Sequence, residues 1–228
     1  MPTPRNRDRH LIHFIRERMM NMKRFFAGLM MLLLSSLVFA ADVTPPDELV
    51  KANATEVLDI IKKDKDIQAG NKKKIKELVE AKVLPHFDFT RMTRLAVGRF
   101  WNQATPVQQQ ALVNEFRSLL VRTYSASLSA YRDQKIDYKP LKMNPADTDV
   151  VVKTVVHQSN GGQSIPIDYS LAKAAEGWKV YDIVVDGVSL VVNYRSSFAH
   201  EIQQGGIDQL VHTLQAKNNG AAPDTKKN

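Results

Sequence analysis

Apolar residues follow two different periods along the chain, one in each half. Between about residues 44 and 131 they recur every three or four positions, as Val57, Ile60 and Ile61 do, which predicts amphipathic helices. After Asp133 the chain changes to short segments rich in β-branched and aromatic residues, which predict strands. Helices followed by strands, with further helices at the C-terminal end, indicate an α+β domain.

The helical half contains several recognisable helix ends. Thr44 is expected to cap the first helix. A second helix is expected over about 71–83, ending before Pro85. A third is expected to begin after Asp88 as its N-cap and to end at Gly98.

The strongest helix signal is the segment TPVQQQALVNEFRSLLVRTYSASLSAY. Thr105, Pro106 and Gln108 form a capping box with proline at the first helical position. The apolar positions then keep a helical period for about six turns, as far as Tyr131. Small residues in the SASLS part leave one side of this helix thin, so another helix or a ligand can approach it closely.

Four strands are expected in the second half, because the turn signals NPADTD, SNGG and AAEG separate four β-rich segments. Such short turns join antiparallel neighbours, so we expect a curved antiparallel sheet packed against the helices. The stretch VVDGVSLVVNYRSSF is expected to turn at Asp186-Gly187 and to enter a helix near Ser189 that ends at Gly205-Gly206, before a final short helix. The strands are placed at 135–141, 150–157, 164–172 and 178–185.

Residues 22–41, MKRFFAGLMMLLLSSLVFAA, have the pattern of a secretory signal peptide. Lys23 and Arg24 precede an apolar run that is short for a membrane span, and small residues favour cleavage after Ala40. An uncleaved membrane anchor is the alternative interpretation.

We interpret the chain as four parts, one of which is the signal peptide at residues 22–41, called the leader below. Residues 1–21 are interpreted as an extension upstream of a natural start at Met22. Residues 42–217 are expected to form one folded domain. Residues 218–228 lack apolar content and are expected to be a disordered tail.

Charge and composition exclude several classes of protein. The whole chain has a net charge of +8, but its first 40 residues hold seven Lys/Arg and two Asp/Glu, so the remainder has a net charge of +3. No stripe of basic residues interleaved with aromatic ones occurs, which disfavours nucleic-acid binding. Because the sequence has no cysteine, a disulfide framework, a thiolate nucleophile and a Cys-ligated metal are excluded.

Candidate catalytic residues are few. Asp88 follows His86 closely, but its position favours a helix cap over an acid–base pair. Ser189 lacks the second glycine of a nucleophile elbow, which disfavours a hydrolase. No metal or other cofactor is expected, because the histidines after the leader do not pair at metal-ligand spacing. They are His86, His157, His200 and His212.

Two blocks of sequence carry a family resemblance. The first is DFTRMTRLAVGRFWNQATPVQQQALVNEFRSLLVRTY and the second is DGVSLVVNYRSSFAHEIQQGGIDQLVHTL. Both resemble the MlaC family of periplasmic phospholipid-binding proteins, also called the toluene-tolerance family. The residues that match the family's pattern in the first block are Asp88-Phe89, Gly98 with Trp101, Thr105 with Gln108, and Thr123-Tyr124.

The resemblance implies a periplasmic carrier with an NTF2-like or MlaC-like fold, which encloses the acyl chains of a phospholipid in an apolar cavity. It further implies two partners that exchange the lipid. One is the MCE-domain subunit of an inner-membrane ABC transporter, and the other is an outer-membrane lipoprotein–porin complex. Such a system maintains the lipid asymmetry of the outer membrane. Phospholipid is the only ligand that the resemblance implies, and no catalytic activity is expected.

The tails are expected to lie between the long helix and the sheet. The helix positions follow one stripe, whereas the strand positions assume one inward parity, which a slip of one residue would reverse. Two alternatives remain: a periplasmic interaction module or chaperone with a solid core, and an enzyme on a similar cone-shaped fold with Asp168 or Asp182 as a buried acid. The expected cavity residues are Leu120, Tyr124, Leu128, Val152, Ile167, Tyr169 and Val184.

Overall fold

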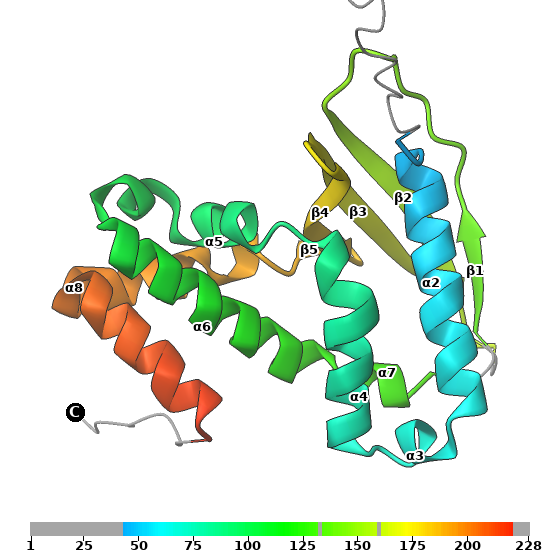
Figure 1. The fold of residues 1–228 in the computed structure, drawn as a ribbon, viewed down its shortest axis with the longest axis horizontal. Helices are drawn as coiled ribbons and strands as arrows, with labels where there is room; N and C mark the ends of the chain where they lie inside the picture. Colours follow the sequence, from blue (N-terminus) through cyan, green and yellow to red (C-terminus); the bar gives the residue numbers. More distant parts are fainter. Residues whose placement is uncertain (1–42, 132–133, 159–160, 221–228) are drawn as a thin grey trace, which may run out of the picture. The chain divides into compact units, whose positions relative to one another are not determined.

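A computed structural model describes residues 43–131, 134–158 and 161–220 (Figure 1). The expected leader at 22–41, residues 1–21 and residues 221–228 of the expected tail lie outside these ranges. The α-helices are α2 (Pro46–Lys63), α3 (Lys65–Gln68), α4 (Lys72–Leu78), α5 (Phe89–Val97), α6 (Pro106–Tyr124), α7 (Ala126–Ser129) and α8 (Arg195–Asn218). The irregular turns are the π-helix η2 (Val79–Val83) and the 3₁₀ helices η3 (Leu84–His86), η4 (Gly98–Gln103) and η5 (Val192–Tyr194).

One antiparallel sheet follows the helices, with its strands in sequence order. This confirms the expected meander and the α+β class. Helix α2 runs along the sheet (Figure 1), and its Val50 packs among the buried side chains of β2, β3 and β4. The strands are β1 (Lys135–Tyr138), β2 (Asp149–His157), β3 (Ile165–Ala174), β4 (Gly177–Val185) and β5 (Val188–Ser189).

A β-bulge interrupts the pairing of β3 with β4. Leu171 lies opposite Val180, but the preceding Ser170 lies opposite Asp182, so Tyr181 is an extra residue on β4. Because side chains alternate between the two faces of a strand, one extra residue reverses the alternation beyond it. Trp178 and Val180 therefore share a face with residue 183 and not with residue 184.

Two of the expected helix caps are confirmed. The Asp88 carboxylate accepts the Arg91 backbone N–H at 2.8 Å, and Thr105 and Gln108 form the expected capping box at the start of α6. The first helix differs from expectation, because Pro45 occupies its N-cap position and no side chain caps it. Proline within the first turn supplies the helical φ angle without a cap.

The long helix ends earlier than its apolar period predicts. Helix α6 stops at Tyr124, and the short α7 follows after a break at Ser125. The Ser125 hydroxyl donates a hydrogen bond to the Val121 carbonyl oxygen one turn back. Such a bond can bend a helix, but Ser125 keeps helical backbone angles and its N–H still bonds to the Val121 carbonyl oxygen at 2.9 Å, so the interruption between α6 and α7 is slight.

The second helix widens before it ends. After α4, the turn η2 is π-helical, and the Leu84 backbone N–H bonds to the Val79 carbonyl oxygen five positions back. The 3₁₀ turn η3 follows and contains Pro85, which has no N–H to donate to a continuing α-helix.

A serine holds the start of the segment after the sheet. The Ser189 hydroxyl oxygen accepts the Val192 backbone N–H at 2.8 Å, but the turn that follows is 3₁₀ with Val191 at its N-cap position, and the α-helix begins only at Arg195. The expected interruption at Gly205-Gly206 is confirmed, because both residues have non-helical backbone angles and kink α8.

Buried side chains form three clusters. The helical core joins α5, α6 and α8 around Leu112 and Phe116, both fully buried. The sheet core holds Val152, Leu171 and Trp178 together with Val50 of α2, and the N-terminal core joins α2, α3 and α4. Within the described ranges, no helix combines the length and apolar character that a membrane span requires.

Candidate functional site

An apolar hollow of about 220 Å³ lies where the three cores meet. Met92 and Leu120 belong to the helical core, Ile183 packs against the sheet core, and Val83 and Leu128 pack against the N-terminal core. A domain usually fills the space between its elements with one contiguous core. The apolar space where the edges of the three cores meet is therefore a candidate binding cavity.

The walls of the hollow come from helices on one side and the sheet with its following loop on the other. Eleven of the thirteen lining side chains are apolar, so the space favours an apolar ligand. The thirteen are Val79, Val83, Leu84, Phe87, Phe89, Met92, Leu120, Val121, Tyr124, Ser125, Leu128, Ile183 and Leu190.

The two polar side chains in this wall carry no charge. Burial, with a smaller contribution from Tyr194, raises the pKa of Tyr124 to about 12, so its phenol stays neutral at physiological pH. The Ser125 hydroxyl is already bonded to the Val121 carbonyl oxygen. The lining therefore offers nothing that would attract an ion.

Three of the seven expected cavity residues line the hollow, namely Leu120, Tyr124 and Leu128. They lie on one stripe of α6 and α7, and the break at Ser125 does not move Leu128 away from it. The four expected strand residues do not line it.

Three of those strand residues share the face that points to the hollow. Val152 pairs with Tyr169, which in turn pairs with Ile183, and directly opposite residues share a face of the sheet. Ile183 is the member of this row that reaches the hollow. Val152 is only 1% exposed and is packed inside the sheet core, and Ile167 lies farther along β3.

Val184 requires a correction, because it lies on the opposite face of the sheet. Its partner in the register is Asp168, not Tyr169. The physical reason is the bulge at Tyr181, which shifts the inward position of β4 to Ile183. No feature of the sequence of this strand indicates the bulge.

Several lining residues were not expected from the sequence. Val79 and Val83 belong to the π-helical turn η2, and Leu84 directly follows it. Phe87 precedes α5, and Phe89 is the first residue of that helix. The rings of Phe87 and Phe89 stack with their centres 5.9 Å apart. The doublet of phenylalanines around Asp88 is the signal that could have indicated them.

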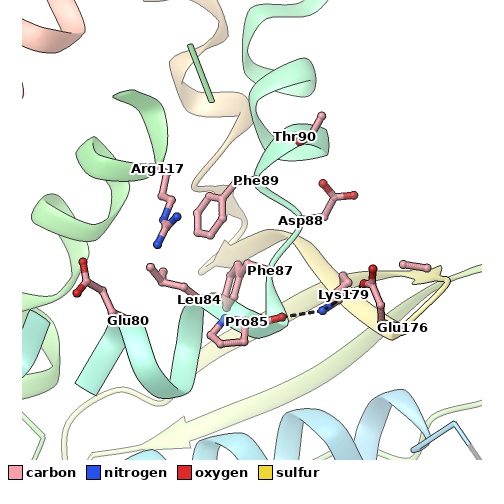
Figure 2. Close-up of a pocket in the computed structure, with 11 residues that line it drawn as sticks. Glu80, Leu84, Pro85, Phe87, Asp88, Phe89, Thr90, Arg117, Glu176 and Lys179 are labelled. Atoms are coloured by element: carbon pink, nitrogen blue, oxygen red, sulfur yellow. Dashed lines mark hydrogen bonds and ion pairs between the residues drawn. The ribbon is translucent and has the colours of Figure 1, made fainter. Parts of the chain in front are cut away.

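Two clefts with charged residues in their linings adjoin the hollow and share Leu84 with it. We call the first the hairpin cleft, about 540 Å³, because it reaches the β3–β4 turn at Glu176 and Lys179. Figure 2 shows it, with Arg117 beside Phe89 and with Lys179 bonded to the Pro85 carbonyl oxygen at 2.8 Å.

The second, the basic cleft, measures about 950 Å³ and lies between α4 and α6. It shares Leu84, Val121 and Ser125 with the hollow, so the two spaces adjoin along α6. Its charged lining residues are Lys72, Lys76, Glu80, Arg117 and Arg122.

The two carboxylates considered for an enzyme are engaged elsewhere. Asp168 forms an ion pair with Lys153 at 2.5 Å, and the buried Asp182 accepts the hydroxyl hydrogen of Ser189 at 2.6 Å. Both belong to the face of the sheet opposite Ile183. Neither carboxylate lines the hollow or either cleft.

One hydrogen-bonded chain of catalytic residue types occurs at the far end of the sheet. His157 contacts Ser164 through Nδ1 at 2.9 Å and Asp137 through Nε2 at 2.8 Å. All three residues lie outside the linings of the hollow and the clefts, and they join β1 and β2 to the start of β3. Across the described ranges, no three His, Cys, Asp or Glu side chains converge as metal ligands would.

The sequence matches the MlaC protein family over residues 51–216. It is 25% identical over 182 residues to toluene tolerance protein ttg2D of Pseudomonas putida, covering 79% of this chain and 84% of that protein. It is 26% identical over 159 residues to the intermembrane phospholipid transport system binding protein MlaC of Haemophilus influenzae, covering 66% of this chain and 74% of that protein.

The fold is also similar to a solved structure, the phospholipid-binding protein from Ralstonia solanacearum in complex with a phospholipid. The TM-score is 0.71 and the sequence identity 43%, over 77% of this chain and 97% of that one. The family match, over residues 51–216, includes every residue that lines the hollow. The chain belongs to the MlaC family.

Proposed function

We propose that this chain is a phospholipid carrier that holds acyl chains in the apolar hollow. The observation that carries the proposal is the hollow itself, whose uncharged walls lie at the junction of three separate cores. The complex of the Ralstonia relative with a phospholipid supports the same ligand class. We propose Leu120, Tyr124 and Leu128 as tail contacts, with Ile183 as the contact from the sheet.

The physical need for such a carrier is large. Each CH₂ group removed from water contributes about 0.8 kcal/mol, so exposing one chain of ~16 carbons costs roughly 13 kcal/mol. A free phospholipid therefore leaves a membrane too rarely to cross water at a useful rate. A protein that encloses the tails and leaves the headgroup in solvent removes most of this cost.

The hollow has to widen to accept a diacyl lipid. Its volume of about 220 Å³ is below the roughly 300–1,000 Å³ of most ligand pockets. Both helical walls contain irregular turns that can move, the π-helical η2 on one side and the break at Ser125 on the other. We propose that these two turns separate when the tails enter.

We further propose that residues 42–217 act in the periplasm after cleavage of the leader, and that no metal or nucleotide is needed. The carrier then moves phospholipid between the MCE-domain subunit of an inner-membrane ABC transporter and an outer-membrane lipoprotein–porin complex. The name of the Haemophilus relative, an intermembrane phospholipid transport system binding protein, supports this role.

Mass spectrometry of a denaturing extract tests the proposal. Protein purified from cells without added lipid is expected to release phospholipid in a fixed molar ratio of at least one per chain. Extraction of a globular control protein of similar size, purified in parallel, defines the background. An extract with no phospholipid above that background would exclude the carrier function.

Sequencing of the exported protein tests the location. The expected N-terminus is Ala41 or Asp42, in the periplasmic fraction. An intact N-terminus at Met22 in the membrane fraction would instead favour the anchor.

A further inference from the structure

Arg117 lies at the mouth of the apolar hollow. It precedes Val121 by four positions and Tyr124 by seven on α6, so the three side chains share one face of the helix. Val121 and Tyr124 line the hollow, whereas Arg117 lines both clefts. Its guanidinium lies 5.6 Å from the ring centre of Phe89, which belongs to the wall of the hollow (Figure 2).

No ion pair engages this guanidinium within the part of the chain that the structure describes. Glu80, which lines the same two clefts, pairs instead with Lys76 at 3.7 Å. Lys179 of the hairpin cleft bonds to the Pro85 carbonyl oxygen. Arg117 is therefore a cation beside the apolar space whose hydrogen-bond donors remain available to a ligand.

The net charges of the residues that line the two clefts differ in sign. The basic cleft has Lys72, Lys76, Arg117 and Arg122 against the single carboxylate of Glu80. The hairpin cleft has three carboxylates against two cations. An anionic group that emerges from the hollow is attracted to the basic cleft and repelled from the hairpin cleft.

We propose that Arg117 binds the phosphate of the carried phospholipid and that the headgroup extends into the basic cleft, so that anionic phospholipids are preferred over zwitterionic ones. This rests on the proposed carrier function. A guanidinium offers paired N–H donors that match two phosphate oxygens. The glycerol of phosphatidylglycerol can lie among the surrounding cations, whereas the ammonium of phosphatidylethanolamine is repelled by them.

A lipid-exchange experiment tests the proposal. The purified protein is incubated with vesicles of equal phosphatidylglycerol and phosphatidylethanolamine with identical acyl chains, then re-isolated, and its bound lipids are quantified by mass spectrometry. At low salt, the protein is expected to bind about three molecules of phosphatidylglycerol for each molecule of phosphatidylethanolamine, although the vesicles hold equal amounts. A preference of this size is expected because an exposed ionic contact contributes little free energy. The excess should fall at high salt, because exposed charges are screened.

Three variants sharpen the experiment. Arg117→Gln is expected to bring the bound ratio close to that of the vesicles. Arg117→Lys keeps the charge without the paired donors and should retain an intermediate excess. Arg94→Gln, the same change at an exposed helical arginine outside both clefts, is expected to behave as the unaltered protein.

The outcomes separate the two proposals. If the unaltered protein binds lipid without any excess of phosphatidylglycerol, the headgroup inference alone is overturned. The same follows if the excess is unchanged in Arg117→Gln. Absence of any bound lipid in the unaltered protein overturns the carrier function. Circular dichroism of each variant establishes that it is folded, and Arg117→Lys provides the decisive comparison if Arg117→Gln does not fold.

Discussion

Ser189 donates its hydroxyl hydrogen to the buried carboxylate of Asp182 at 2.6 Å, while its oxygen accepts the Val192 backbone N–H. The second carboxylate oxygen of Asp182 accepts the backbone N–H of Val191 at 3.3 Å. This pair fixes the chain where it leaves the sheet and enters the C-terminal helices. It also positions Leu190, which lines the hollow.

Replacing this serine with alanine should therefore destabilise the fold without a direct effect on lipid. Ser189→Ala leaves the buried carboxylate of Asp182 short of a donor and removes the acceptor of the Val192 backbone N–H. We expect a loss of about 1–3 kcal/mol in the free energy of unfolding, measured by urea denaturation. Ser197→Ala, at an exposed serine of α8, is the control and should cost less than about 0.5 kcal/mol. Equal stability of the two variants would contradict the role assigned to the pair.

A charge at Ile183 should abolish lipid binding while the protein stays folded. Ile183→Glu sets a carboxylate without a partner against the acyl chains, and the neighbouring clefts give it a route to water when the hollow is empty. The phospholipid-to-protein ratio after denaturing extraction is expected to fall by at least about tenfold.

The neighbouring residue is the matched control for that change. Val184 is on the opposite face of the same strand, so Val184→Glu should keep its lipid. Loss of lipid in Val184→Glu with retention in Ile183→Glu would mean that the face assigned to the hollow is reversed.

The same substitution at Val152 should have a different result. Val152 is 1% exposed and lies inside the sheet core, where a carboxylate has neither water nor a partner. We expect Val152→Glu to unfold the protein, detected as loss of the cooperative thermal transition. Val151→Glu, at the exposed neighbour on the other face, should remain folded.

Alkaline pH should destabilise the fold through buried tyrosines. Burial raises the pKa of Tyr124 and of Tyr169 to about 12, above the ordinary value of 10.0. Between these values the unfolded chain releases protons that the folded chain retains, so stability present below pH 10 is lost as the pH rises toward 12. Denaturant titrations from pH 9 to 12 should show a shallower decline for Tyr169→Phe than for the unaltered protein. Identical slopes would mean that Tyr169 does not titrate abnormally.

Gly98 should tolerate no side chain. Its backbone angles, φ 62° and ψ −134°, are open to glycine and strained for other residues. Gly98→Ala is expected to lower the free energy of unfolding by about 1–3 kcal/mol. Asn102→Ala, at an exposed position of the same 3₁₀ turn, serves as the comparison and should be nearly neutral.

Local signals in the sequence predicted those features that depend on neighbours along the chain. The capping box at Thr105 and the cap at Asp88 involve residues three positions apart, so their hydrogen bonds follow from helix geometry alone. The cavity stripe on the long helix was predictable for the same reason, because the 3.6-residue period places Leu120, Tyr124 and Leu128 on one side.

The features that the sequence did not reveal depend on packing between distant segments. The bulge at Tyr181 arises in the pairing of β3 with β4, and it moved the inward position from Val184 to Ile183. Val152 has the correct parity, yet α2 covers it through Val50 and makes it core instead of cavity wall. The helices that pack on a sheet face decide where that face is filled and where it is left hollow. The alternation of residues along a strand shows only which face a side chain lies on.

The π-helical turn before Pro85 amounts to one inserted residue in an otherwise ordinary helix. In a regular α-helix, Val79 and Leu84 would point about 140° apart. The wider turn brings both to the wall of the hollow, together with Val83. Deleting a single residue from this turn would restore the tighter spiral and swing Leu84 away, however apolar the remaining side chains were. The length of this five-residue turn is thus as much a determinant of the cavity as the chemistry of its walls.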